Sequence, residues 1–264
     1  MIKKEKYLGV GVTNATEKEV SEYIFARLHK RGKRFFVVTP NPELIMLAQH
    51  DPKYKSILNE ADLSLPDGVG LFFASLLLGH PLKERIPGID FVEELCRRSK
   101  NNPMSIGLLG AGKGVAQQAS DRLQEKYPWI KVVYACEEWD EKVLMIKDFG
   151  LKHKEIGGKR IVNRKSYLLN QPMDILFVAF GSPKQEKWIH AHFSELPAQM
   201  VMGVGGAFDF ISGNIVRAPY LIRAIGMEWL FRLMVQPWRI KRQLALLRFI
   251  WLVLIVRLGL KKVN

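Results

Sequence analysis

Residues 174–183, with the sequence DILFVAFGSP, are the stretch that decides the fold of this protein. Every position after the first in Asp174–Phe180 is apolar, and the run stops at Gly181, Ser182 and Pro183. A short apolar run bounded by turn-forming residues is typical of a strand buried on both faces of a parallel sheet. The residues from 184 onward have the pattern of a loop that enters a helix, so the stretch predicts one strand–turn–helix unit.

The same unit recurs along the 264 residues of the chain. We predict the other strands at 7–12, 34–39, 63–65, 105–109, 130–136 and 199–204. We predict helices at 17–30, 43–50, 53–60, 70–78 and 90–100, and one from the glycines at 110–112 to 126. Strands that alternate with helices indicate an α/β protein with a mostly parallel, Rossmann-like sheet and helices on both faces.

Polar or glycine residues follow the ends of five predicted strands. They are Thr39, Asp67, Gly110, Gly181 and Gly205. Because ligands of parallel sheets bind beyond the carboxyl ends of the strands, we expect these residues to meet at one edge of the sheet. This edge is the predicted functional site.

Asp67, in Leu65-Pro66-Asp67-Gly68, is the first candidate for a catalytic residue. A lone Asp at a strand end is more often a turn residue or a helix cap. A carboxylate that can reach a sugar hydroxyl could instead act as a general base. The residues that we expect around it favour this second role, and they are Thr39, Asn41, Arg85 and Gln185.

Three glycine-containing loops are candidates for binding a nucleotide diphosphate. Gly107-x-x-x-x-Gly112-Lys113 nearly matches a P-loop, but Gly114 stands where the Mg²⁺-binding hydroxyl would be. This loop, with Gly110, fits either a tight strand-to-helix turn or a helix N-terminus that holds a diphosphate. In the other two loops glycines permit close backbone approach. Their expected ligand-binding residues are Gly181, Lys184, Gly205, Gly206 and Asp209, of which the last could bind ribose or uracil or cap a helix.

The net charge of +14 is concentrated at the end of the chain. Residues 214–264 hold ten Lys and Arg and a single acid, Glu228, and so contribute +9 of it. A basic segment indicates an acidic partner, such as an anionic membrane, phosphates or nucleic acid. Large apolar residues alternate with arginine in this segment, which suits a lipid surface better than a nucleic acid.

We therefore divide the chain into a catalytic α/β domain, 1–213, and a basic, helical, membrane-associating appendage, 214–264. The longest apolar run, Phe249–Val256, is too short to cross a hydrocarbon core about 30 Å thick. Residues 244–260 approach that length only by burying two arginines. We expect this helix to lie in the membrane interface, with a subunit-contact helix as the alternative. Since all predicted strands precede 213, we expect the catalytic domain to close its core without the appendage.

Residue types that bind metals are sparse. The two cysteines, Cys96 and Cys136, lie far apart in sequence, which fits a reduced, cytosolic protein. His190 and His192 are two residues apart and would point to different faces of a helix. The chain has no Asp-x-Asp pair to hold Mg²⁺ or Mn²⁺ on a diphosphate. We therefore expect no metal and no cofactor, with Arg and Lys neutralising the charge of the substrate.

Five ordered sequence blocks resemble the WecG/TagA/CpsF family of bacterial glycosyltransferases. They are Thr39-Pro40-Asn41-Pro42-Glu43, Asp62–Gly70, Glu84–Asp90, Gly181–Trp188 and Gly203–Asp209. The segments Arg217-Ala218-Pro219 and Gly226-x-Glu228-Trp229-Leu230-x-Arg232 resemble the tail of the family. The resemblance covers nearly the whole chain. Residues 137–171 depart from it, and we interpret them as a helix followed by an irregular or inserted segment.

The resemblance implies an inverting, metal-independent transfer from a UDP-sugar, often of N-acetylmannosamine or its uronate. The implied acceptor is N-acetylglucosamine linked through a diphosphate to undecaprenol, in the synthesis of teichoic acid, common antigen or capsule. The enzyme would be peripheral on the inner face of the plasma membrane, with an anionic membrane surface and no nucleic acid as partner. Assembly into a homo-oligomer is left open.

The resemblance also assigns roles to residues of this chain. Asp67 matches the proposed general base of the family, and Arg85 matches an arginine of the pocket. Residues that match the sugar pocket are Thr39, Asn41 and Gln185. Arg217 and Arg223 match tail residues thought to complete the site over the diphosphates.

Two alternatives come from other classes of protein. A nucleotide-dependent oxidoreductase would need an acid about twenty residues past the glycine turn. Glu137 and Glu138 follow a predicted strand, but the third glycine is missing from its usual place. A nucleic-acid-binding protein would use the basic tail and would show exposed aromatic residues along a groove.

Overall fold

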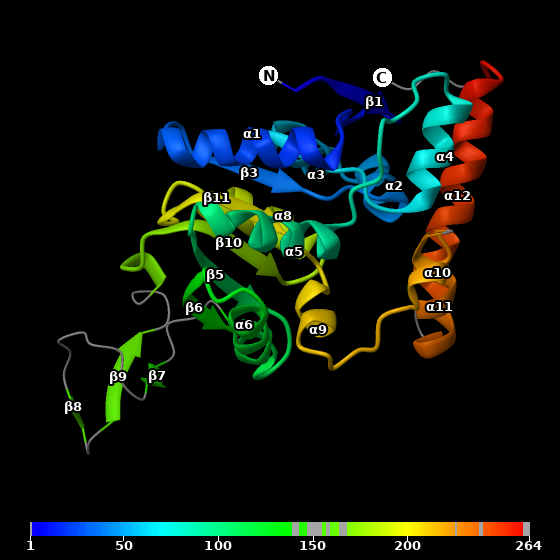
Figure 1. The fold of residues 1–264 in the computed structure, drawn as a ribbon. Coiled ribbons are helices and arrows are strands. Elements are labelled where there is room, and N and C mark those ends of the chain that lie inside the picture. Colours follow the sequence, from blue (N-terminus) through cyan, green and yellow to red (C-terminus); the bar gives the residue numbers. More distant parts are fainter. Residues whose placement is uncertain are drawn as a thin grey trace.

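A six-stranded parallel sheet forms the centre of the protein (Figure 1). The computed structural model describes residues 2–138, 143–146, 155–156, 159–163, 168–224, 226–237 and 240–260. In it the strand order is β4-β3-β11-β10-β5-β6, and every neighbouring pair is parallel. The strands are β3 (Phe35–Val38), β4 (Leu63–Ser64), β5 (Ser105–Gly110), β6 (Lys131–Cys136), β10 (Met173–Ala179) and β11 (Ala198–Gly203). The predicted α/β class and parallel sheet are confirmed.

Helices cover both faces of the sheet, and successive strand residues face opposite sides. In β3, for example, Phe35 and Val37 belong to one hydrophobic cluster, whereas Phe36 and Val38 belong to the other. Burial on both faces explains why these strands are continuously apolar in sequence. The first cluster includes α1 (Glu17–Lys30), α5 (Gly88–Arg98) and α6 (Val115–Lys126). The second includes α2 (Pro42–His50), α3 (Pro52–Glu60), α4 (Val69–Leu77) and α8 (Lys184–His192).

The N-terminal residues form a hairpin and not the single strand predicted at 7–12. Strands β1 (Lys4–Tyr7) and β2 (Val10–Thr13) pair antiparallel. Leu8 and Gly9 make the turn between them, with φ angles of 49° and 79°. A positive φ at Leu8 is uncommon for a side chain with a Cβ. Because Leu8 is apolar and is not a residue typical of turns, the sequence pattern predicted a continuous strand there.

Residues 137–171 also differ from the prediction where they are described. Residues 143–163 of this segment hold strands β7 (Val143–Ile146), β8 (Glu155–Ile156) and β9 (Lys159–Asn163), which pair antiparallel in the order β7-β9-β8. A strand therefore stands at 143–146, in the part where a helix was predicted. Residues 137–138 and 168–171 are also described, with helix at 168 and 169, and the remaining residues of the segment lie outside the described residues.

The C-terminal segment contributes part of the hydrophobic core. It contains α10 (Tyr220–Ala224), α11 (Glu228–Val235) and α12 (Ile240–Arg257), which follow α9 (Ala207–Ile211). Helix α12 runs beside α2 and α4 (Figure 1). Phe249 and Val253 on α12 are fully buried in the same cluster as the second face of the sheet.

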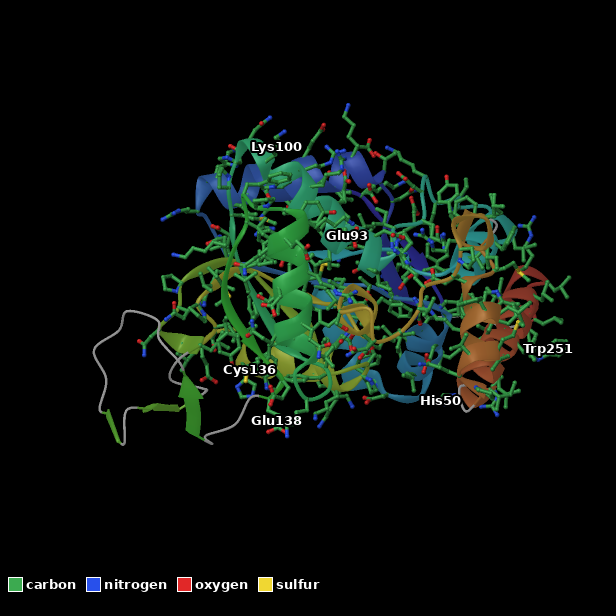
Figure 2. All side chains as sticks on the ribbon, turned by 60° about the horizontal axis from the view of Figure 1, so that its bottom comes forward. His50, Glu93, Lys100, Cys136, Glu138 and Trp251 are labelled. Carbon is green, nitrogen blue, oxygen red and sulfur yellow. The ribbon has the colours of Figure 1, made fainter. Side chains whose placement is uncertain are left out.

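The expectation that residues 1–213 close their own core is therefore wrong, because α12 supplies buried side chains to that core. The division of the chain at residue 213 stays a prediction. The other side of α12 is open, and Trp251 lies at the outer edge of the molecule (Figure 2). Among the described helices, none has both the length and the apolar character needed to cross a bilayer.

Phe249→Ala should lower the free energy of unfolding by about 3–5 kcal/mol, because it removes a buried ring and leaves a cavity. Urea unfolding of the purified protein measures this change. Trp251→Ala is the matched control on the same helix, since Trp251 is 67% exposed. It should change the free energy by less than about 0.5 kcal/mol. Equal effects of the two substitutions would show that α12 does not pack on the core in solution.

Candidate active site

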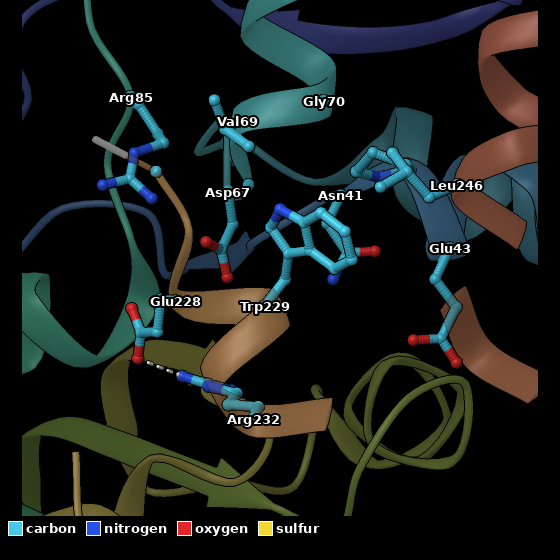
Figure 3. A pocket seen from close by; sticks show the side chains of 13 residues that line it. Asn41, Glu43, Asp67, Val69, Gly70, Arg85, Glu228, Trp229, Arg232 and Leu246 are labelled. Atoms are coloured by element: carbon cyan, nitrogen blue, oxygen red, sulfur yellow. Dashed lines mark hydrogen bonds and ion pairs between the residues drawn. The ribbon is translucent and has the colours of Figure 1, made fainter. Parts of the chain in front are cut away.

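Two adjoining cavities open at the carboxyl edge of the sheet. The outer cavity, about 170 Å³, is lined by residues of α4, α11 and α12, among them Val69, Gly70, Trp229 and Leu246 (Figure 3). The inner cavity, about 140 Å³, is lined by the loops after β3, β10 and β11, among them Thr39, Gly181, Gln185, Gly205 and Gly206. Both are lined by Asn41, Glu43, Asp67, Glu228 and Arg232.

Asp67 lies where the two cavities meet. Its backbone N–H donates to the Pro40 carbonyl at 3.0 Å, so the loops after β3 and β4 stay side by side beyond the sheet. Figure 3 shows the carboxylate between Arg85 and Arg232. Burial raises the pKa of Asp67, the charges of Arg232 and Arg85 oppose that rise, and the charge of Glu228 adds to it. This environment is suited to a carboxylate that accepts a proton.

Thr39 and Asn41 follow β3 and line the inner cavity. The Thr39 hydroxyl is buried and donates to the Gly203 carbonyl at 3.4 Å. The Asn41 side-chain oxygen accepts the Leu44 N–H at 3.0 Å and so caps α2. Asn41 is thus a helix cap that also lines both cavities, and the structure brings both residues to Asp67 as predicted.

Gln185 fixes the loop after β11. Its side chain is buried, and its oxygen accepts the Gly205 N–H at 2.9 Å. Its amide nitrogen donates to Glu186 at 2.7 Å and to Ser182 at 3.2 Å. A Cβ on Gly203 would lie 2.9 Å from that nitrogen, which explains the glycine there. Gln185 therefore joins the loops after β10 and β11 into one wall of the inner cavity.

The comparison with known proteins identifies the family. The model of the glycosyl transferase WecG/TagA/CpsF family matches residues 5–263. The chain belongs to this family. The resemblance inferred from the five sequence blocks is confirmed, and the oxidoreductase and nucleic-acid-binding alternatives are set aside.

Curated relatives of this glycosyl transferase are named N-acetylglucosaminyldiphosphoundecaprenol N-acetyl-beta-D-mannosaminyltransferase. The protein from Bacillus spizizenii is 32% identical over 224 residues, which are 85% of this chain and 80% of the relative. The protein from Staphylococcus aureus strain MRSA252 is 32% identical over 262 residues, 98% of this chain and 95% of the relative. The similarity therefore includes the C-terminal helices.

Three predicted substrate-binding residues of the glycosyl transferase that precede the tail, Gly110, Lys184 and Asp209, do not line either cavity. A Cβ on Gly110, where φ is 109°, would lie 2.8 Å from the Ala179 carbonyl carbon, so strand packing alone requires this glycine. The Lys184 ammonium lies 5.4 Å from the centre of the Phe180 ring. The Asp209 carboxylate lies beside Gly206, 3.4 Å from where a Cβ on that glycine would stand. Gly181, Gly205 and Gly206 do line it.

Arg217 and Arg223 are engaged with the protein itself. Arg217 donates to both carboxylate oxygens of Asp90, at 2.6 and 2.7 Å, and lies 3.5 Å from Glu228. Arg223 donates to the Ala218 carbonyl at 3.0 Å and lies 3.6 Å from Asp90. Neither lines a cavity, so the structure does not bring them to the site in the way that the sequence predicted.

The sequence analysis missed two charged residues of α11 that line both cavities, Glu228 and Arg232. Arg232 donates to the Glu228 carboxylate at 2.7 Å. The signal was present in the sequence, because an acid and an arginine four residues apart share one face of a helix. Trp229 and Glu43 were not predicted as site residues either, although both lie within the sequence segments that resemble the family.

The histidines take part in separate surface contacts. His190 lies 2.9 Å from Glu60, and His192 lies 2.9 Å from Glu195. Within the part of the chain that the structure describes, His, Cys, Asp and Glu side chains form no group of three that could hold a metal ion.

Arg217→Met should destabilise the protein by about 1–3 kcal/mol, since it removes two charge-assisted hydrogen bonds from a partly exposed acid. A double-mutant cycle with Asp90→Ala, measured by urea unfolding, isolates the pair. Arg223→Met should show a much smaller coupling with Asp90→Ala, because only one 3.6 Å contact is lost. Equal coupling energies would contradict the structural role of Arg217.

Proposed function

We propose that this protein transfers N-acetylmannosamine from a UDP-sugar to N-acetylglucosamine linked through a diphosphate to undecaprenol. The position of Asp67 at the junction of two cavities supports this reaction most strongly, because a transferase must bring a donor and an acceptor to one base. The names of the relatives supply the two sugars and the lipid. The product would enter a cell-surface polymer such as teichoic acid.

The donor fits the inner cavity and the acceptor fits the outer one. The glycine loops at 181 and 205–206 line the inner cavity, and glycine permits close backbone approach to a ligand such as a nucleotide diphosphate. Trp229, Val69 and Leu246 give the outer cavity an apolar side that leads to the exposed helices α4 and α12. A sugar on a lipid would arrive from that side.

In the proposed reaction, an acceptor hydroxyl attacks the anomeric carbon of the donor sugar. The bond between that carbon and the β-phosphate oxygen breaks, and its electron pair stays on the phosphate. Asp67 takes the proton of the attacking hydroxyl. Attack from the face opposite the leaving UDP inverts the configuration of the anomeric carbon.

The charge of the leaving UDP requires compensation. We expect arginine side chains and backbone N–H groups to provide it, and so expect the reaction to need no metal. Arg232 and Arg85 line the outer cavity, and their charges act on Asp67.

A panel of UDP-sugars, assayed with a short-chain lipid-diphosphate-N-acetylglucosamine, tests the function. UDP-N-acetylmannosamine should be used at least tenfold faster than UDP-N-acetylglucosamine. The rate should persist in EDTA. Absence of transfer from any UDP-sugar would refute the function. Loss of the rate in EDTA and its return with Mg²⁺ or Mn²⁺ would refute metal independence alone.

Asp67→Asn should lower kcat by about 100-fold or more, the usual scale for a general base, and leave UDP affinity nearly unchanged. The unsubstituted enzyme should lose activity on the acid side as Asp67 becomes protonated. Because burial raises the pKa of Asp67, that loss should begin at higher pH than for an ordinary aspartate. Asp121→Asn, at an exposed position of α6, is the control. Near-normal turnover of Asp67→Asn would remove this residue from the mechanism.

The open side of α12 supports peripheral membrane binding. Exposed apolar residues recur every three or four positions on it, as Leu244, Leu247, Trp251 and Leu254, and exposed Leu258 follows the helix. On the neighbouring α4, Phe73, Leu76 and Leu77 are exposed as well. Apolar residues beside the arginines of a basic tail are typical of helices that lie in an anionic membrane surface.

Leu247→Ser combined with Trp251→Ser should weaken binding to phosphatidylglycerol-containing vesicles by about tenfold or more. The reason is that the two apolar side chains expected to insert into the lipid are lost. Turnover of a water-soluble acceptor should stay within twofold. Co-sedimentation and turnover are measured on the same preparation. The control is Lys18→Ser combined with Glu22→Ser on α1, where both side chains are exposed. Unchanged vesicle binding would exclude α12 as the membrane-binding helix.

A further inference from the structure

We propose that Glu186 is a positioning residue of this glycosyl transferase. Its buried carboxylate orients the side-chain amide of Gln185, and through Gln185 it holds the loop of Gly205 and Gly206 where the donor binds. This inference rests on the proposed function and extends it to a residue that lines neither cavity.

The Glu186 carboxylate is fully buried and is held by neutral groups. The Ser182 hydroxyl and the Gln185 amide nitrogen each donate to its Oε1 at 2.7 Å, and the Tyr54 hydroxyl donates to its Oε2 at 3.2 Å. Burial raises the pKa of Glu186, and these hydrogen bonds oppose that rise. Because burying a carboxylate costs free energy, we infer its role from the groups that it orients.

The orientation of the Gln185 amide depends on this carboxylate. The amide nitrogen donates to Glu186 and, at 3.2 Å, to Ser182, so the amide oxygen faces the Gly205 N–H at 2.9 Å. An amide rotated by a half-turn would fill nearly the same space. It would set its oxygen against the carboxylate and its N–H groups against the Gly205 N–H. An ionised carboxylate accepts hydrogen bonds and donates none, so Glu186 selects the observed orientation.

The loop after β11 takes its position from this amide. The Val204 N–H donates to the Val178 carbonyl at 2.9 Å, and the next N–H along the chain, that of Gly205, donates to Gln185. The chain turns at Gly205, where φ is 55°, and Gly205 and Gly206 line the inner cavity. Both N–H donors of Gln185 are used inside the protein, so its effect on a donor passes through this loop. A displacement of about 1 Å in such a wall is enough to weaken a productive complex.

Asp67 lies on a loop outside this network. It follows β4, and its backbone N–H donates to the Pro40 carbonyl. Loss of the Glu186 carboxylate should therefore weaken donor binding and leave the chemical step at Asp67 nearly intact. The two effects separate in kinetics, the first as the KM for the donor and the second as kcat.

The test measures the KM for UDP-N-acetylmannosamine and kcat on the full chain, with a short-chain acceptor. Glu186→Leu removes both acceptor oxygens at similar size. It should raise the donor KM by about tenfold or more and leave kcat within about threefold. Glu186→Gln keeps an oxygen that can accept from Gln185, so the KM should rise by less than about threefold. Gln185→Met should resemble Glu186→Leu, and combining the two should have no further effect, as a residue that acts only through Gln185 requires.

An exchange of the two side chains tests the orientation itself. Gln185→Glu alone sets two carboxylates against each other, where the amide nitrogen and the carboxylate now lie 2.7 Å apart. It should raise the donor KM by about tenfold or more. Gln185→Glu combined with Glu186→Gln restores one donor and one acceptor between the positions and keeps an oxygen toward the Gly205 N–H. The double variant should recover a KM within about threefold of the unsubstituted protein.

Asp174→Leu is the matched control. Asp174 lies near the opposite end of β10, accepts both the N–H and the hydroxyl of Ser105 at 2.8 Å, and lines neither cavity of the site. Its loss should lower the stability measured by urea unfolding. It should change the donor KM by less than twofold.

Each outcome decides between the claims. If the unsubstituted protein transfers sugar from no UDP-sugar, the proposed function fails, and the calorimetric UDP affinities of the same variants then test the inference. If it transfers sugar and Glu186→Leu leaves the donor KM within twofold, the inference is overturned while the function stands. Equal changes of KM in Glu186→Leu and Asp174→Leu would also overturn it, since they would show a loss through stability alone. Should Glu186→Leu not fold, the exchange decides: recovery of the KM supports the inference, and no recovery relative to Gln185→Glu overturns it.

Discussion

The paired hydrogen bonds between Arg217 and Asp90 connect the two halves of the site. Asp90 lies on α5, which covers one face of the sheet, and Arg217 lies in the segment that leads to the C-terminal helices. Arg217 also lies 3.5 Å from Glu228, so this contact ties α5 to the helix that carries Glu228 and Arg232. Helix α12, which follows α11, packs on α2 and α4.

The site combines carboxylates and arginines at close range, and the balance of their charges affects the pKa of Asp67. Burial favours the protonated acid, whereas Arg232 and Arg85 favour the ionised base. Both influences come from parts of the chain distant in sequence. The charge of Asp67, the proposed general base, thus depends in part on Arg232, which lies on a helix of the tail.

Much of this site followed from the sequence because parallel strands end at one edge. Thr39, Asn41, Asp67 and Gln185 could be brought together from strand positions alone, and the structure does so. The tail was harder, because the partners of an arginine depend on tertiary packing. The spacing of Glu228 and Arg232 predicts that they share a helix face, but it does not show that this face lines the cavities or that Arg217 binds Asp90. The burial of Phe249 was hidden for the same reason, since α12 is apolar on the side that packs and on the side that does not.

Helix α12 is fixed to the core by Phe249 and Val253 and is open on its other side. Docking of this open side on a membrane, as proposed, would hold Asp67 at a constant height above the lipid headgroups. An acceptor with one sugar on its diphosphate would reach that height, whereas a longer glycan would carry its terminal hydroxyl past it. A rigid docking surface can therefore limit the reaction to a single addition, without any pocket that counts sugars.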